Sequence, residues 1–163
     1  MDYIVTKKTS SAKGILFSIS KKSGQPIRFF LTNSKTLYGV EKFYANKLVK
    51  WTIDKQVYIE LTDFEIGLLD AINKYVEKEK LQYESIELVS KILSDSRFPT
   101  MIQTILEGNS AEIIKHSSGS VVSFNDITKG FIANVQLEVK SVNISGGKLY
   151  YNIVNKIIEP NSA

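Results

Sequence analysis

The stretch FIANVQLEVKSVNISGGKLYYNIVNKII, residues 131–158, decides the fold class. Its first part puts every second residue on one apolar face: Phe131, Ala133, Val135, Leu137 and Val139. After Ser141 the apolar positions shift by one residue. Because neighbouring residues of a strand point to opposite faces, the shift predicts a bulge or sharp bend, as in a strand at a barrel corner. A Gly-Gly pair then predicts a tight turn before a last strand over 148–158.

Upstream of this stretch, alternating apolar and polar residues predict further antiparallel strands. A basic turn joins the segments 14–20 and 26–32 into a first hairpin. The segments 37–44 and 47–53 form a second hairpin, and 57–61 is another short strand. Residues 1–13, which are polar and basic, are expected to form a flexible arm.

The period changes after these strands. Thr62-Asp63-Phe64-Glu65 matches a capping box, in which the side chains of Thr62 and Glu65 satisfy free amides at a helix start. Helical spacing of apolar residues then predicts helices over 63–80 and 84–94. We therefore expect a helical insert over residues 62–95.

Pro99 reopens β structure, with strands expected over 100–106, 112–115 and 121–124. The chain is thus expected to be one domain, residues 1–163, mostly β with a helical insert (α+β). We predict a small antiparallel β-barrel resembling an OB fold, with one or two helices between the third and fourth barrel strands. The alternative is an α+β sandwich.

The charges are sorted along the chain. Residues 1–56 carry a net charge of +8, residues 57–112 carry −6 and residues 113–163 carry +2. The basic segment also holds eight of the seventeen Phe, Tyr and Trp residues. Cations neutralise phosphates and flat rings stack on unpaired bases, so this combination favours single-stranded nucleic acid.

The candidate nucleic-acid-binding residues are cations and rings of the predicted strands and turns: Lys21, Lys22, Arg28, Phe30, Tyr38, Lys42, Tyr44, Lys47, Lys50, Trp51, Lys148 and Tyr150. Phe30 shares an outward face with Arg28, so it either stacks on a base or is covered by the helices or by another subunit. Trp51 aligns with Val49, which leaves it as either a core residue or a base platform.

Other chemistry finds little support. The chain has no cysteine, which excludes disulfides and thiolate catalysis. His116, the only histidine, has no recognisable catalytic partner, and residues 145–148 lack the spacing of a phosphate-binding loop. We expect no enzyme activity, no cofactor and no metal. No apolar run approaches the ~18 residues of a membrane span, so we expect no membrane and an intracellular location, in the cytoplasm.

Segments 13–20, 26–33, 62–80, 99–103, 123–127 and 132–159 are similar in order to the OB-fold single-stranded DNA-binding proteins of large nucleocytoplasmic DNA viruses, the asfarvirus type in particular. The likeness spans about residues 13–159 and lies in layout, with few identities. It implies sequence-independent binding in replication, repair or recombination, with replication proteins as partners and a viral replication site as the other location.

The sequence therefore predicts a non-catalytic protein that coats single-stranded DNA, with RNA as another ligand and with homo-oligomers or cooperative coating. The alternative is a protein-interaction or structural module whose bipolar charge drives self-association or inhibits a partner. A metal-dependent nuclease that uses the helical carboxylates is a third possibility.

Overall fold

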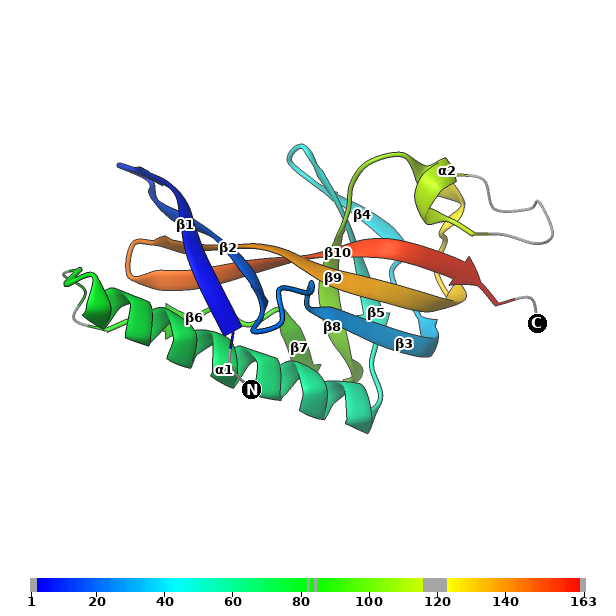
Figure 1. Ribbon diagram of the computed structural model, residues 1–163. Coiled ribbons are helices and arrows are strands. Elements are labelled where there is room, and N and C mark those ends of the chain that lie inside the picture. Colours follow the sequence, from blue (N-terminus) through cyan, green and yellow to red (C-terminus); the bar gives the residue numbers. More distant parts are fainter. Residues whose placement is uncertain (1–2, 82, 84, 116–122, 162–163) are drawn as a thin grey trace.

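The computed structural model describes residues 3–81, 83, 85–115 and 123–161. Within these residues the chain is mostly β, with ten strands in one sheet and one long helix, α1 (Lys55–Lys78) (Figure 1). The strands are β1 (Tyr3–Ser11), β2 (Gly14–Lys21), β3 (Arg28–Lys35), β4 (Val40–Phe43), β5 (Asn46–Thr52), β6 (Glu87–Leu88), β7 (Ile92–Asp95), β8 (Phe98–Leu106), β9 (Ile132–Ser145) and β10 (Lys148–Pro160). Two short helical turns, α2 (Ser110–Ile113) and η1 (Phe124–Asp126), lie between β8 and β9.

The long hairpin β9–β10 forms the middle of the sheet. Its ladder pairs Asn152 with Ser141 and Ile153 with Val139, which leaves Lys140 as an extra residue. The irregularity expected from the change of apolar parity is therefore confirmed, because a bulge at Lys140 turns both halves of β9 toward the core. The free side of β9 is shared by two strands, β3 along its first half and β2 along its second.

The sheet path is β1-β2-β9-β10-β8-β5-β4, with β3 also on β9. β8 and β10 run parallel, with Val154 opposite Ile105. The predicted hairpin of 37–44 with 47–53 is confirmed as β4–β5. The hairpin expected from 14–20 with 26–32 is wrong, because within the described residues β2 and β3 pair with β9 and not with each other. In Figure 1 this hairpin projects on the side of the sheet away from α1.

The ends of β3 and β5 meet through side chains. The Ser34 hydroxyl donates to the Thr52 carbonyl at 2.9 Å, and the Lys35 amide donates to the Thr52 hydroxyl at 3.0 Å. Between the described residues of β3 and β5 no backbone ladder forms, so the sheet stays open there.

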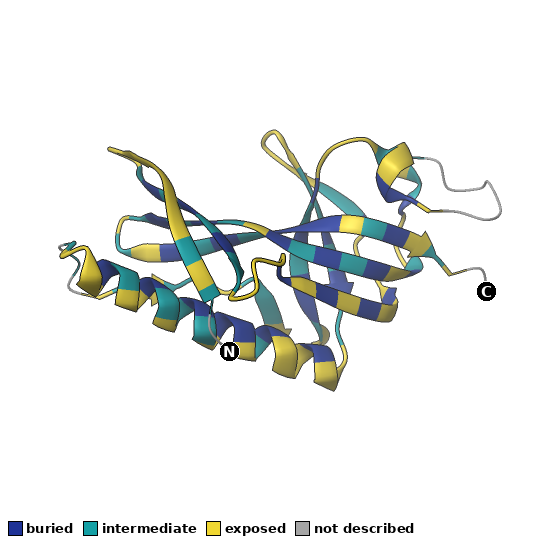
Figure 2. Cartoon of the chain, viewed as in Figure 1, coloured by how far each residue is buried: buried dark blue, intermediate teal, exposed yellow. Residues whose placement is uncertain are grey.

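Helix α1 packs on one face of the sheet, over the strands β1, β2 and β3. Its N-cap residue is Asp54, whose carboxylate accepts a hydrogen bond from the Val57 amide at 2.8 Å. Its buried side chains recur at helical spacing: Val57, Leu61, Phe64, Glu65, Leu68, Ile72 and Val76. The Phe64 ring packs edge-on against Tyr3 and Phe29, and Figure 2 shows this buried stripe along the helix.

The helix begins earlier than predicted. The strand expected over 57–61 is wrong, because Val57 and Leu61 extend the apolar stripe of α1 by a further turn and Asp54 supplies the cap. Thr62 and Glu65 lie inside the helix, so the predicted capping box does not exist. Glu65 is instead buried, and accepts hydrogen bonds from the Tyr151 hydroxyl at 2.5 Å and the Ser90 hydroxyl at 2.6 Å.

The rest of the expected insert 62–95 is not helical. Its second half forms β6 and β7, which extend β10 and β8. The Val89 amide donates to the Leu149 carbonyl at 2.9 Å, so the open edge of β10 provides hydrogen bonds that a helix would have made internally. Helix α1 follows the five strands β1 to β5 and precedes β6, β7 and β8. The prediction placed the helices between the third and fourth barrel strands.

Three further expectations concern the segments 1–13, 112–115 and 121–124. The flexible arm expected over 1–13 is wrong for Tyr3–Ser11, because β1 pairs with β2 and the Tyr3 ring packs on α1. The strand expected over 112–115 is a helical turn followed by one bridge, Ile114 to Ile158. Residues 121 and 122 of the strand expected over 121–124 lie outside the described residues, and Phe124 begins η1.

Candidate nucleic-acid interface

Trp51 is a core residue and cannot be a base platform. Strand β5 directs it inward with Val49, and its side chain is fully buried. The indole Nε1 donates to the Asn155 side-chain oxygen at 2.8 Å, and the Asn155 amide nitrogen donates to the Thr104 hydroxyl at 2.8 Å. The prediction of Trp51 as a ligand contact is therefore wrong, because the indole satisfies its one polar group inside the protein.

Two rings and two cations gather on the outer face of β5 and β8. We call Tyr38, Lys50, Arg97 and Phe98 the Tyr38 cluster. The Lys50 Nζ lies 5.2 Å from the Tyr38 ring centroid, and the Tyr38 and Phe98 centroids are 6.4 Å apart in an edge-on arrangement. The Arg97 guanidinium lies 5.7 Å from the Phe98 ring. Tyr38 is 36% exposed and Phe98 43%, so both rings are open to a ligand.

Tight turns bring the members of the Tyr38 cluster together. Tyr38 sits in the turn between β3 and β4, which Thr36 fixes by accepting a hydrogen bond from the Gly39 amide at 3.0 Å. Gly39 adopts a φ of +70° and lies against the Ile127 carbonyl, so a side chain there would clash as well as strain the backbone. On the other side of the cluster, the two-residue turn between β7 and β8 places Arg97 beside Phe98, the first residue of β8.

Each cation of the Tyr38 cluster has a carboxylate partner. Lys50 lies 3.2 Å from Glu41, and Arg97 donates two side-chain hydrogen bonds to Asp95 at 3.2 and 3.0 Å. These hydrogen bonds hold the pKa of Asp95 below its ordinary value and raise the pKa of Arg97. The Arg97–Asp95 pair is largely exposed and therefore weak, so a phosphate can compete for Arg97. The Lys50–Glu41 pair is partly buried, with side chains 22% and 39% exposed.

A second group of rings stands at the turn of the β4–β5 hairpin. We call Lys42, Phe43, Tyr44 and Lys47 the hairpin tip. Tyr44 is 92% exposed and adopts a φ of 55°, a left-handed conformation that costs a bulky residue on the order of 1 kcal/mol. Its ring meets that of Phe43 edge-on at 4.6 Å, and Lys42 and Lys47 face each other across the hairpin. No ion pair within the described part of the chain includes either lysine.

Arg28 and Phe30 share the outward face of β3, as predicted. Phe30 is 64% exposed, while its neighbours Phe29 and Leu31 are buried. The Arg28 Nε, however, donates to Glu138 at 2.9 Å, and Lys156 approaches the same carboxylate at 3.7 Å. Arg28 is therefore held in an ion pair, and two cations share this one carboxylate.

The remaining predicted residues lie elsewhere. Lys21 and Lys22 are at the turn that follows β2, beside α1. Lys148 and Tyr150 begin β10, where Lys148 faces Glu87 of β6 and Tyr150 is half-buried. In Figure 1 the β9–β10 turn lies beside the carboxyl-terminal half of α1, far along the sheet from β4. The structure thus brings together Tyr38 and Lys50 in the Tyr38 cluster, and Lys42, Tyr44 and Lys47 at the hairpin tip. By strand register Lys42 and Lys47 lie on the face of the hairpin that carries Val49, and Lys50 lies on the other face.

The sequence reasoning missed Arg97 and Phe98. A signal was present, because Arg28 and Arg97 are the only arginines of the chain and each lies close to a phenylalanine in sequence. The region was assigned to a helix that ended near residue 94. That error removed the β7–β8 turn which exposes both side chains.

The other features that the sequence singled out are a glycine turn, a metal site, a membrane span and His116. The turn expected at residues 145–148 is confirmed, with Gly146 and Gly147 at positive φ between β9 and β10. Among the described residues no group of three or more His, Asp or Glu side chains could hold a metal ion, and no helix is long and apolar enough to cross a membrane. His116 lies outside the described residues.

No protein-family model matches the chain, and a search of curated protein sequences finds no match. The similarity to viral single-stranded DNA-binding proteins therefore stays a prediction.

Proposed function

We propose that the protein binds single-stranded DNA without catalysis and with little sequence preference, and that the Tyr38 cluster is the centre of the binding surface. The observation that carries this proposal is the alternation Lys50, Tyr38, Phe98, Arg97 on one exposed face. Two rings can each stack on a base, and two flanking cations can each contact a phosphate. Lys42 and Lys47, which form no ion pair among the described residues, add positive charge beyond the cluster, and the Lys47 Nζ lies 5.8 Å from the Phe124 ring centroid.

The order of the strands supports the same location. Strands β3, β5, β8, β9 and β10 follow the path β3-β9-β10-β8-β5, whose ends meet at Ser34 and Thr52. We infer a partly open barrel of OB type, in which β5 and β8 are the second and third strands. OB folds bind oligonucleotides on the face of these strands and on the loop before the second. The Tyr38 cluster and the hairpin tip occupy that face and that loop.

Fluorescence anisotropy with labelled oligonucleotides tests the proposal. We expect single-stranded DNA to bind more tightly than duplex DNA, because only unpaired bases can stack on the rings. If about five phosphates are neutralised, the logarithm of the affinity falls with the logarithm of salt at a slope of roughly −3 to −4. Single-stranded RNA measured in parallel shows whether the sugar matters. Equal affinity for duplex, or no dependence on salt, would contradict the proposal.

A matched pair of variants locates the surface. Phe98 and Tyr58 are both 43% exposed, but Phe98 belongs to the Tyr38 cluster and Tyr58 lies on α1. Losing one stacked base costs about 1–3 kcal/mol, so Phe98→Ala should weaken binding roughly 5- to 150-fold. Tyr58→Ala should bind like the wild type. A reversed order of the two variants would place the surface on the helical side.

A further inference from the structure

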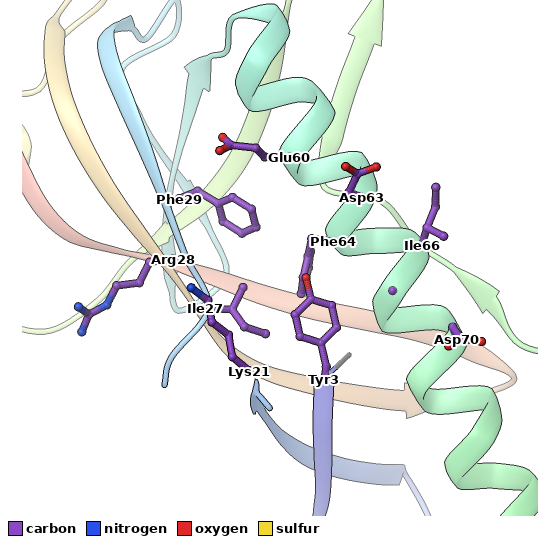
Figure 3. A pocket seen from close by; sticks show the side chains of 11 residues that line it. Tyr3, Lys21, Ile27, Arg28, Phe29, Glu60, Asp63, Phe64, Ile66 and Asp70 are labelled. Atoms are coloured by element: carbon purple, nitrogen blue, oxygen red, sulfur yellow. The ribbon is translucent and has the colours of Figure 1, made fainter. Parts of the chain in front are cut away.

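A cavity of about 630 Å³ lies between α1 and the strands β1, β2 and β3. Its floor is apolar, because the buried side chains of Ile27, Phe29 and Phe64 line it. Figure 3 shows the rings of Tyr3, Phe29 and Phe64 turned toward this space, while the guanidinium of Arg28 points away from it. The cavity therefore offers apolar surface at the end of the molecule opposite the hairpin tip.

The helical rim of the cavity is acidic. Glu60, Asp63 and Asp70 line it from α1, together with Ile66, an isoleucine that is 64% exposed. Asp70 pairs with Lys74 at 3.0 Å, but among the ion pairs of the described residues none includes Glu60 or Asp63. The opposite rim contributes one cation that faces the space, Lys21. Carboxylates thus surround an apolar floor.

The hairpin tip has the complementary character. Two exposed rings stand at its end, and Lys42 and Lys47 flank them without ion-pair partners in the described chain. The two-residue turn makes the tip narrow, and it projects on the side of the sheet away from α1 (Figure 1). An apolar end with cationic sides fits an apolar floor with an anionic rim.

We propose that the hairpin tip of one molecule docks into the α1 cavity of a second copy. The rings of Phe43 and Tyr44 would cover the apolar floor, and the two lysines would meet Glu60 and Asp63. Because the two surfaces belong to different parts of the chain, the contact is head-to-tail and can repeat along an open row. A contact of this size is weak and depends on salt. Docking itself requires no nucleic acid, so it stands apart from the proposed function.

Analytical ultracentrifugation without nucleic acid tests this inference. At low salt the weight-average mass should rise above the monomer mass of 18.4 kDa as the protein concentration increases. In about 0.5 M salt, where charges are screened within a few ångströms, it should fall back toward the monomer. A monomer at every concentration in low salt would overturn the inference.

Charge reversal identifies the two surfaces. Lys42→Glu with Lys47→Glu should abolish association, and so should Glu60→Lys with Asp63→Lys. An equimolar mixture of these two proteins should associate again in alternating rows, because the reversed tip of the first matches the reversed cavity of the second and the wild-type tip of the second matches the wild-type cavity of the first. The combined quadruple variant should also recover association. Failure of both the mixture and the quadruple variant to associate would overturn the inference.

A control on the same helix excludes a general charge effect. Glu77 and Glu79 are exposed at the carboxyl end of α1, outside the cavity, and Glu77→Lys with Glu79→Lys should leave association unchanged. A second readout separates docking from nucleic-acid binding. Ile66→Ser, at the exposed rim of the cavity, should weaken association yet keep the affinity for an oligonucleotide of about eight nucleotides within twofold. Unchanged association with weakened oligonucleotide binding would overturn the inference.

Discussion

Two places on the outer surface of the sheet carry an arginine near an exposed phenylalanine, and they differ in what surrounds the pair. On β3, Arg28 is held by Glu138, and the Phe30 ring has no aromatic partner among the described residues. At the start of β8, Phe98 meets a second ring, Tyr38, and a second cation, Lys50, follows. The comparison teaches that a ring and a cation side by side in sequence do not make a site. Turns that bring a second ring and a second cation from other strands do.

The largest expected effect distinguishes buried rings from exposed ones. Trp51 and Phe30 were both candidates for stacking, yet Trp51 is buried in the core and its indole donates a hydrogen bond to Asn155. Trp51→Ala should lower the free energy of unfolding by about 3–5 kcal/mol, because it leaves a large cavity and an unpaired amide. Phe30→Ala should change it by less than about 0.5 kcal/mol, as is usual for surface positions. Urea denaturation measures both, and similar losses would mean that Phe30 is also packed.

The next effect sets the two exposed places against each other. Tyr38→Ala should weaken binding of single-stranded DNA by about 1–3 kcal/mol, the cost of one lost stack. Phe30→Ala should weaken it by less than half of that, because among the described residues no second ring stands beside Phe30 to form a stacking surface. Anisotropy titrations at one fixed salt concentration compare them. If the Phe30 variant loses as much as the Tyr38 variant, the distinction between the two places fails.

A pH test extends the comparison to a buried tyrosine. Burial, and next the hydrogen bond to Glu65, raise the pKa of Tyr151 above its ordinary value. Below about pH 10 the hydroxyl is neutral in both folded and unfolded chains, so its stabilisation is complete. Above pH 10 the unfolded chain ionises first, and the free energy of unfolding should fall by about 1.4 kcal/mol per pH unit from this group.

Urea denaturation at pH 9, 10 and 11 checks this expectation, with Tyr151→Phe as the comparison. The variant starts from a lower stability, because Glu65 loses a donor, but its stability should fall less steeply above pH 10. Tyr3, whose pKa is raised by burial and by the charge of Asp63, retains a smaller slope in both proteins. Identical slopes would show that Tyr151 is accessible to hydroxide in the folded state.

The smallest expected effect comes from releasing Arg28. Glu138→Gln removes the carboxylate that Arg28 and Lys156 share, so both cations become available beside Phe30. We expect single-stranded DNA to bind up to about fivefold more tightly, since an exposed pair contributes at most ~1 kcal/mol. The measurement is anisotropy at low salt with Glu159→Gln, another exposed acid near the end of β10, as the charge-matched control. Equal gains in the two variants would indicate a general charge effect.

Much of the sheet could be read from the sequence because alternation is a local signal. The β4–β5 hairpin, the β9–β10 hairpin and the bulge at Lys140 were predictable from the apolar parity of each strand. The start of α1 was not, because Val57–Leu61 also satisfies a short strand pattern and only the cap at Asp54 distinguishes the two. Strands β6 and β7 take their hydrogen bonds from β10 and β8, which are distant in sequence, so local spacing alone favoured a helix.

The candidate site was predictable only in part, for a related reason. The parity of β3 correctly placed Phe30 outside, but it could not show that Glu138 of β9 would bind Arg28. The parity of β5 left open which side of the strand Trp51 takes, and the residue that settles it, Asn155, accepts the indole hydrogen bond from β10. Tyr38 was identified, while its partner Phe98 depends on the β7–β8 turn. Each missed feature joins two segments that only the folded chain brings together.

Photocrosslinking tests the central claim most directly. Single-stranded DNA in which 5-iododeoxyuridine replaces thymidine forms covalent crosslinks, on irradiation, to the aromatic side chains that its bases contact. Mass spectrometry of the digested adducts identifies those residues. We predict adducts at Tyr38 and Phe98, lost in high salt and absent with duplex DNA of the same sequence. Adducts confined to Phe30, Tyr150 or the rings of α1, with Tyr38 and Phe98 unmodified, would contradict the account.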